Sequence, residues 1–228
     1  MELKRSMHAR TARLLAMLAM ALVCALVLVP SAYADGAVAR IDETGSEYNT
    51  FDEAVAAAKN GETVTLLADA ETAGLNLSKD LTIDGDGKAL TFAGEGIALF
   101  GKALTFENVT VSMTSVGSTP YAEWKWMAVS ASGGASITLD NASLAMDGAK
   151  TAKNTHAIYF TGDNTLNLKN GSSLTIENYP QDALEWDGGS GKGYNVNIEG
   201  DSTYTSDHNR SGFTGTFYAT IDHSTVNV

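Results

Sequence analysis

The sequence predicts an all-β fold, a parallel β-helix solenoid that begins with a short capping helix. The first observation is a repeat: LTFEN at residues 104–108 and ITLDN at 137–141 both alternate apolar and polar residues before an acid and an amide. Four weaker copies, LTIDG, LNLKN, VNIEG and ATIDH, start at residues 81, 166, 196 and 219. The copies are spaced 23–33 residues apart, and a period in this range is typical of solenoids.

The fifth position of the repeat is the second observation. It holds only Gly, Asn or His, the residues that best tolerate a positive φ. Each copy is therefore expected to be a short strand followed by a left-handed corner, with corners at Gly85, Asn108, Asn141, Asn170, Gly200 and His223.

A second short, alternating strand usually follows the corner, and a loop then leads to the next copy. Alternation leaves one apolar face on each strand, and stacking on the next copy buries that face. A β-sandwich is the alternative, since many short strands with Gly and Asn turns suit it too. A sandwich does not explain why the same corner follows the same strand. The longest gap, 108–141, is expected to hold an inserted loop.

The helix expected at about residues 50–60 begins with Thr50 and Glu53, spaced as in a capping box. Phe51, Val55 and Ala58 share one face, and Asn60-Gly61 is expected to end the helix in a left-handed cap. A first strand at 63–67 follows. Such a helix would cover the open end of the coil, which otherwise invites edge-to-edge association.

Residues 1–34 have the features of a secretory signal peptide: basic residues, an apolar run at 14–29, and Ala32-Tyr33-Ala34 as a cleavage site before Asp35. A transmembrane anchor is the alternative, but the run is shorter than the roughly 20 residues a bilayer needs. Cys24, the sole cysteine, lies in this run. The sequence therefore predicts a secreted or cell-surface domain at 35–228 with no disulfide and no thiol ligand.

The charge of the predicted mature chain excludes one class of partner. The signal peptide holds four of the 15 Lys and Arg and one of the 27 Asp and Glu, so residues 35–228 carry a formal charge of −15. Such a surface repels nucleic acids and other polyanions. Only Arg40 and Arg210 remain as arginines, which nearly excludes bidentate clamps on acidic sugars.

Residues 48–92, which include YNTFDEAVAAAKNGETVTLLAD and LTIDGDGKALTF, resemble the start of right-handed parallel β-helix (pectate-lyase-like) domains. Such domains occur in secreted surface proteins of Gram-positive bacteria, and the resemblance continues loosely to residue 228. It implies a fold and an extracellular setting rather than a chemistry, because the shared motifs are structural. Relatives of this kind sit on longer, wall-attached chains. This sequence ends at Val228 within a predicted strand, which favours a fragment.

Two acidic groups are candidates for chemistry. Asp182, Glu185 and Asp187 surround Trp186, as carboxylates beside an aromatic platform would in a glycosidase; an acidic surface loop is the alternative. Asp84 and Asp86 are candidate ligands for Ca²⁺, the one cofactor considered. The alternative is that these Asp-Gly pairs form tight turns.

Aromatic residues give the candidate ligand-binding site: Tyr121, Trp124 and Trp126, together with Trp186. Exposed indoles on one strand face would stack on sugar rings or bind a protein. The alternative is that these aromatic side chains close the core under the inserted loop. His156 precedes a strand and has no partner at metal-ligand spacing, so it is assigned no role.

These observations favour a non-catalytic module, a structural stalk or an adhesin-like domain that presents loops to a host or environmental glycan or protein. A polysaccharide-active lyase or glycosidase on the same fold is the alternative function. A remnant without a function of its own is the third possibility.

Overall fold

The computed structural model describes residues 36–120, 126–188 and 191–228. The predicted signal peptide lies outside these ranges, as do Tyr121 and Trp124 of the aromatic group. No helix within the described ranges has the length and apolarity needed to cross a bilayer.

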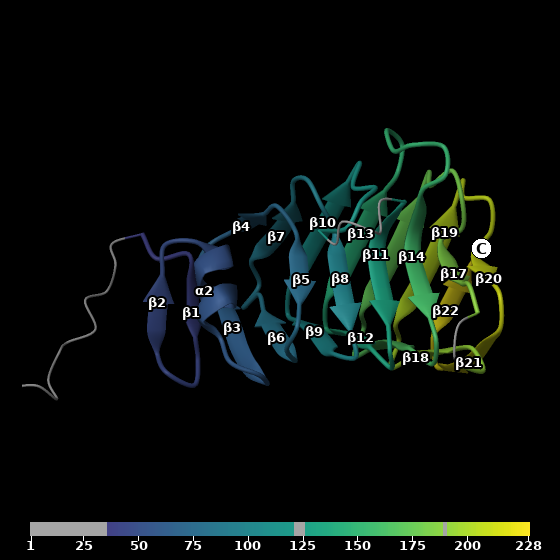
Figure 1. The fold of residues 1–228 in the computed structure, drawn as a ribbon. Coiled ribbons are helices and arrows are strands. Elements are labelled where there is room, and N and C mark those ends of the chain that lie inside the picture. The colour runs from purple at the N-terminus through teal and green to yellow at the C-terminus, as the bar shows by residue number, and fades with distance from the viewer. Residues whose placement is uncertain (1–35, 121–125, 189–190) are drawn as a thin grey trace, which may run out of the picture. The chain divides into compact units, whose positions relative to one another are not determined.

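Three parallel sheets form the fold, and each turn of the coil adds one strand to each sheet (Figure 1). Sheet A contains β3 (Glu62–Leu66), β6 (Leu81–Asp84), β9 (Ala103–Glu107), β12 (Ser136–Asp140), β15 (Thr165–Lys169), β18 (Tyr194–Glu199) and β21 (Phe217–Asp222). Sheet B contains β4 (Ala70–Thr72), β7 (Ala89–Phe92), β10 (Thr110–Thr114), β13 (Ser143–Asp147), β16 (Ser173–Glu177), β19 (Thr203–Asp207) and β22 (Thr225–Asn227). Sheet C contains β5 (Leu75–Leu77), β8 (Ile97–Phe100), β11 (Met127–Ser132), β14 (His156–Thr161), β17 (Leu184–Trp186) and β20 (Phe213–Thr214).

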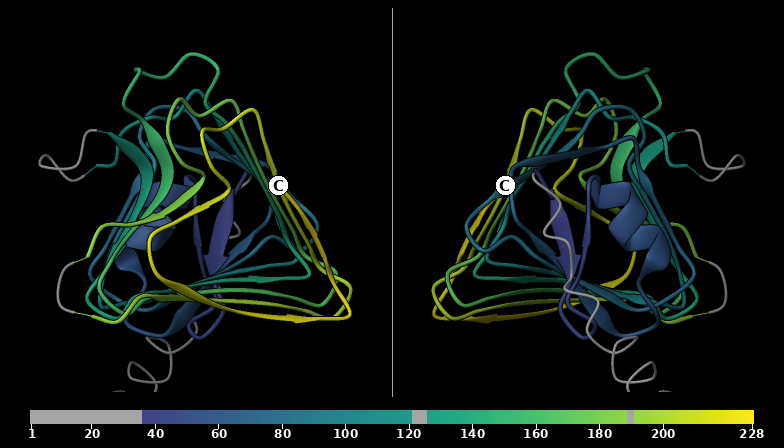
Figure 2. Two further views of the ribbon diagram at one scale, coloured as in Figure 1. Left: turned by 90° about the vertical axis from the view of Figure 1, so that its right-hand side faces the viewer. Right: turned by 90° about the vertical axis from the view of Figure 1, so that its left-hand side faces the viewer.

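Viewed along its axis, the coil is roughly triangular, with one sheet on each side (Figure 2). In the left view the chain runs counter-clockwise as it advances toward the viewer, from β21 along the lower side to β22 on the right. The coil is therefore right-handed. The predicted all-β, right-handed parallel β-helix is confirmed, and the sandwich alternative is excluded because consecutive turns pair in parallel.

One element of the predicted repeat is wrong. The segment expected to be a loop contains the third strand of each turn, the one in sheet C. The distance from the second strand to this third strand is irregular: residues 115–126 separate β10 from β11, whereas 148–155 separate β13 from β14. Such variation hides the strand from a search at fixed spacing. The predicted inserted loop falls between β10 and β11, and residues 121–125 of it lie outside the described ranges.

The left-handed corners are confirmed at five of the predicted positions, between sheets A and B. The φ angles are 49° at Asn108, 49° at Asn141, 56° at Asn170, 64° at Gly200 and 47° at His223. The corner predicted at Gly85 is wrong: the positive φ angles in that turn are 45° at Asp86 and 79° at Gly87.

Gly85 is nonetheless needed for a different reason. A Cβ atom there would lie 2.6 Å from the carbonyl oxygen of Asn108 and 2.6 Å from the Cα of Val109. The backbones of the two turns approach too closely at this point for any side chain.

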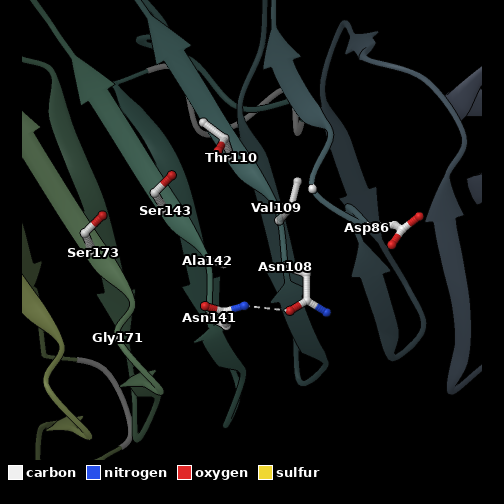
Figure 3. A pocket seen from close by; sticks show the side chains of 10 residues that line it. Asp86, Asn108, Val109, Thr110, Asn141, Ala142, Ser143, Gly171 and Ser173 are labelled. Atoms are coloured by element: carbon white, nitrogen blue, oxygen red, sulfur yellow. Dashed lines mark hydrogen bonds between the residues drawn. The ribbon is translucent and has the colours of Figure 1, made fainter.

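Amide side chains join the stacked corners from turn to turn. Asn141 Nδ2 donates to Asn108 Oδ1 over 2.8 Å, and Asn108 Nδ2 donates to Asp84 Oδ1 over 3.2 Å. Asn170 continues the series by donating to Asp140 over 2.6 Å. Beside the corners lies an open hollow of about 600 Å³, lined by Asn108 and Asn141 and by small residues such as Ser143 (Figure 3).

The core consists of inward-facing columns that run along the coil. Ile137 in β12 pairs in register with Leu104 in β9 and with Leu166 in β15. All three are at most 1% exposed. The outward neighbour in β12, Thr138, pairs with Thr105 and Asn167. Each turn therefore buries its apolar face on the turns above and below, as the alternation predicts.

The first turn is covered by two strands that the sequence did not predict. β1 (Ala39–Ile41) and β2 (Ser46–Tyr48) run antiparallel, and β1 pairs with β3 to extend sheet A. Figure 1 shows both strands at the N-terminal end of the coil, beside α2.

The capping helix α2 spans Phe51–Ala57, and the Thr50 side chain accepts a hydrogen bond from the Glu53 amide, as predicted. The predicted C-terminus at Asn60-Gly61 is wrong, because the helix ends at Ala57. The Lys79 ammonium donates to the carbonyls of Val55 and Ala58. Those otherwise unpaired carbonyls are thus satisfied without a left-handed cap.

Substitution of Asn141 tests the corner conformation. Asn141→Val should lower the free energy of unfolding by about 1–2 kcal/mol, because a left-handed conformation brings Cβ too close to the backbone. Asn141→Gly loses the same amide hydrogen bond but keeps the conformation, so it should cost less. Chemical denaturation measures both, and equal losses in the two variants would contradict a left-handed corner at this residue.

Three buried tyrosines predict loss of stability in alkali. Burial raises the pKa of Tyr179, Tyr194 and Tyr204 above the usual 10. Above pH 10 the unfolded chain ionises at these residues while the folded chain keeps its protons, so the free energy of unfolding should fall as pH rises from there. Tyrosinate absorbance and circular dichroism followed together should show these residues ionising only as the sheets unfold. Complete ionisation of a folded chain would contradict their burial.

Candidate functional site

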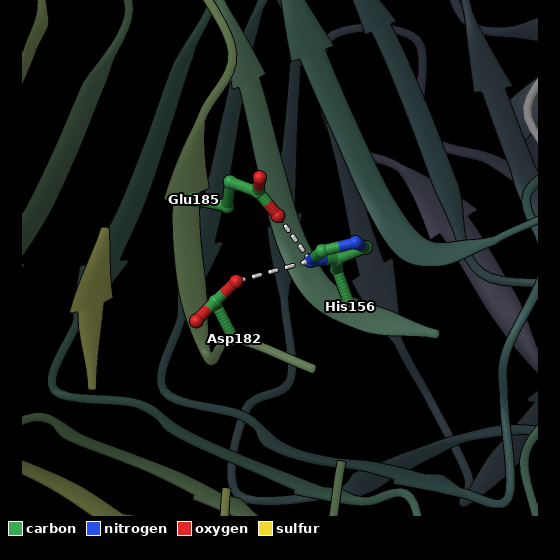
Figure 4. A group of neighbouring side chains, drawn as sticks. All are labelled: His156, Asp182 and Glu185. Atoms are coloured by element: carbon green, nitrogen blue, oxygen red, sulfur yellow. Dashed lines mark ion pairs between the residues drawn. The ribbon is translucent and has the colours of Figure 1, made fainter. Parts of the chain in front are cut away.

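Polar side chains from consecutive turns converge at one end of sheet C. Ile158 in β14 pairs with Leu184 in β17. His156 lies two residues before Ile158, and Asp182 lies two residues before Leu184, so they face each other across the two turns. Glu185 is on the same strand as Leu184. Figure 4 shows His156, Asp182 and Glu185 pointing toward one another.

Asp182 is the most deeply buried member of this cluster, with 1% of its side chain exposed. Arg210 comes from the following turn and holds it with two hydrogen bonds, from Nε to Oδ1 over 3.2 Å and from Nη2 to Oδ2. This fork geometry suits a carboxylate, and the hydrogen bonds to Asp182 raise the pKa of the Arg210 guanidinium. The arginine thus compensates a charge that burial alone would disfavour.

His156 and Glu185 form the second contact of the cluster. His156 Nδ1 touches Glu185 Oε2 and lies 3.7 Å from Asp182 Oδ2. Nδ1 and Oε2 are both inaccessible to solvent, and no hydrogen bond of normal geometry satisfies either atom. Buried polar atoms without such a bond are uncommon in folded proteins, so these two need a physical explanation.

Burial shifts the protonation of this contact toward the neutral forms. It raises the pKa of Glu185 to about 7, and the nearby charge of Asp182 adds to the shift. Burial also lowers the pKa of His156, against the opposing effect of Asp182. Both directions favour a protonated carboxyl group against a neutral imidazole. Because the two groups are in contact, the protonation of one affects the other.

Asp187 joins the cluster through Tyr159. The Tyr159 hydroxyl donates to Asp187 Oδ2 over 2.5 Å, and burial raises the pKa of Tyr159. The Tyr159 ring meets the His156 ring edge-on, with centroids 5.6 Å apart. Tyr159 is also the register partner of Glu185. The structure therefore brings all three predicted carboxylates to one face of sheet C.

The chemistry of the cluster is that of metal-ligating groups. Among the described residues, His156, Asp182 and Glu185 are the one set of three or more such side chains, with a ligand atom from each within 4.8 Å of the others. Imidazole and carboxylate together suit ions such as Zn²⁺. Asp84 and Asp86, the predicted Ca²⁺ ligands, lie outside this set.

Asp84 and Asp86 instead form a local turn. Asp84 Oδ1 accepts hydrogen bonds from the Asp86 amide over 2.9 Å and from Asn108 Nδ2 over 3.2 Å. The turn alternative therefore accounts for both residues, and an Asp side chain bonded to the backbone two residues on is the expected geometry.

The described aromatic candidates differ in exposure. Trp186 packs partly buried against the core, and its indole Nε1 donates to the Gly162 carbonyl over 3.1 Å. Trp126 is 59% exposed. The Trp126 carbonyl accepts a hydrogen bond from the His156 amide over 2.8 Å, so the Trp126 backbone lies next to the cluster.

His156, to which the sequence analysis assigned no role, lies beside two carboxylates in the structure. Its partners are 26 and 29 residues away, close to one period of the coil, rather than at the short spacing of a local metal motif. An alignment of β14 with β17 would have placed His156 opposite Asp182. That alignment was missed because the repeat was traced through the strands of sheets A and B.

Comparisons with models of known protein families, with curated proteins and with solved structures find no match for this chain.

Substitution of Asp182 tests the stabilising role of the ion pair. Asp182→Ala should lower the free energy of unfolding by about 1–3 kcal/mol, because buried partners lose their hydrogen bonds. Asp207→Ala is the matched control: Asp207 pairs with His208 at 3.1 Å, but its side chain is 58% exposed, and such pairs contribute little. Thermal and chemical denaturation measure both, and equal effects would contradict the burial of Asp182.

Proposed function

We propose that this domain is a non-catalytic module of a secreted or cell-surface protein, a stalk or adhesin-like domain that presents loops to a ligand. The predicted signal peptide and the resemblance to pectate-lyase-like β-helix domains of Gram-positive surface proteins supply the setting. The regular coil supplies the physical basis, because a rigid rod is what a spacer requires.

The observation that carries this proposal is the continuous stack of buried apolar side chains along the inner face of sheet A. Parallel pairing joins seven strands of sheet A, from β3 to β21. At about 4.8 Å for each step between strands, they extend roughly 29 Å. Ile83, Phe106, Leu139, Leu168 and Ile198 fill one column of this sheet and are at most 1% exposed. A rod packed in this way resists bending, since every turn contacts its neighbours.

The ligand-presenting part of the proposal rests on the corner between sheets B and C. The segment 148–155 projects there (Figure 2, green), and residues 115–126 also join strands of these two sheets. Trp126, the residue just before β11, offers an exposed indole. The acidic character of the domain favours neutral glycans or basic protein surfaces over polyanions.

A polysaccharide-active enzyme is the second candidate, and one observation favours it. Glu185 has a pKa of about 7, a value suited to general acid or base catalysis near neutral pH. Against it, Asp182 is 1% exposed and held by Arg210, and Asp187 is held by Tyr159. A glycosidase needs two carboxyl groups that both reach the scissile bond.

An activity screen separates the two candidates. We expect no product from neutral or acidic polysaccharides in reducing-sugar and unsaturated-product assays, because the buried Asp182 cannot contact a polymer. If turnover is found and is lost in Glu185→Gln but kept in Glu199→Gln, the enzyme candidate replaces the module. Glu199 is exposed at the end of β18 and so provides the matched control.

Glycan-array binding tests the presentation of Trp126. For a glycan that the purified chain binds, Trp126→Ala should weaken binding about 2–10-fold, the loss typical of one aromatic stacking contact. Tyr218→Ala should leave binding unchanged, since Tyr218 is 55% exposed on β21, away from sheet C. Equal loss in both variants would contradict a ligand site at Trp126.

A further inference from the structure

We propose that His156, Asp182 and Glu185 bind a divalent transition-metal ion of the zinc class on the face of sheet C. The inference goes beyond the role of the domain as a module and does not depend on it. It rests on the geometry of three side chains and on two buried atoms that lack normal hydrogen bonds.

The distances suit such an ion. Zn²⁺ binds imidazole nitrogen and carboxylate oxygen at about 2.0–2.2 Å, so two ligand atoms in a tetrahedral site are about 3.4 Å apart. His156 Nδ1 and Asp182 Oδ2 are 3.7 Å apart. Glu185 Oε2 touches Nδ1, and rotation of its flexible side chain would open the space between them. The ion would then lie between Nδ1 and Oε2.

The unsatisfied atoms are the second observation. His156 Nδ1 and Glu185 Oε2 are both buried without a hydrogen bond of normal geometry. A metal ion between them would satisfy both at once. The side chains of His156 and Glu185 remain 16% and 17% exposed, which leaves a route for the ion and a fourth position for water, as in sites with three protein ligands.

The charge of the surroundings is favourable despite Arg210. With Glu185 ionised, as a metal ligand must be, and His156 neutral, Asp182, Glu185 and Asp187 against Arg210 leave a formal charge of −2, which a divalent ion would balance. Arg210 Nε bonds Asp182 Oδ1, so it can hold that oxygen while Oδ2 turns to the metal. Carboxylate ligands of metals commonly accept such a hydrogen bond from a residue that does not contact the metal. Arg210 Nη2 also bonds Oδ2, and metal binding would replace that bond; the Arg210 side chain is 55% exposed, so water can then solvate Nη2.

The ligand set distinguishes between classes of metal. One nitrogen and two carboxylates suit Zn²⁺ or Co²⁺, whereas Ca²⁺ takes six to eight oxygen ligands. We therefore expect Zn²⁺ and Co²⁺ to compete for the site and Ca²⁺ to leave it unaffected at equal concentration.

The test is a Zn²⁺ titration of the full chain after treatment with a chelator, near neutral pH, with competition against a chromogenic chelator. The wild type should bind one Zn²⁺ at this site. His156→Gln and Glu185→Gln should each weaken that binding more than about 100-fold. Removing a residue that only hydrogen-bonds a ligand, without contacting the metal, typically costs about 10–100-fold. His208→Gln is the matched control, because His208 and Asp207 form an exposed pair 3.1 Å apart.

A second measurement needs no variant. Co²⁺ added to the wild-type chain should give the strong visible absorption of a four-coordinate ion, and Zn²⁺ should abolish it. Circular dichroism without metal checks that each variant is folded. The proposal is overturned if the wild type binds Zn²⁺ no more tightly than the two ligand variants, if His208→Gln removes the binding instead, or if Co²⁺ keeps the spectrum of the hydrated ion.

Discussion

In-register parallel pairing between successive turns is the constraint on which the rest of the molecule depends. Each inward side chain meets its equivalent one turn away, as Ile137 meets Leu104 and Leu166. A slip of one residue would turn a whole column outward, so burial fixes the register firmly. The corner residues serve the same end: Asn108 and Asn141 bend the chain with positive φ at equivalent points and are hydrogen bonded to each other.

The same register assembles the polar cluster from residues that are distant in the sequence. His156, Asp182 and Arg210 belong to three consecutive turns, and no local segment contains them all. The coil thus places a column of ionisable groups on the face of sheet C, as it places columns of leucine and isoleucine in the core. Burial of these charges costs free energy, and the fork of Arg210 on Asp182 offsets part of that cost.

Most of the architecture could be predicted because its signals are local. The alternation in residues 104–108 and 137–141 predicted strands, and the amides that follow predicted left-handed corners. Local signals failed where tertiary contacts matter: Lys79, more than 20 residues away, bonds the carbonyls at the end of helix α2, and close approach to Val109, rather than a positive φ, requires Gly85. Asp182 and Glu185 were identified as candidates, but His156 was not, because the variable loops conceal the register of sheet C.

Backbone nuclear Overhauser effects between β14 and β17 test the central claim most directly, since one register sets both the packing of sheet C and the meeting of His156 with Asp182. The account predicts interstrand contacts that pair Ile158 with Leu184 and Tyr159 with Glu185. Contacts displaced by two residues along either strand, or antiparallel contacts, would contradict it.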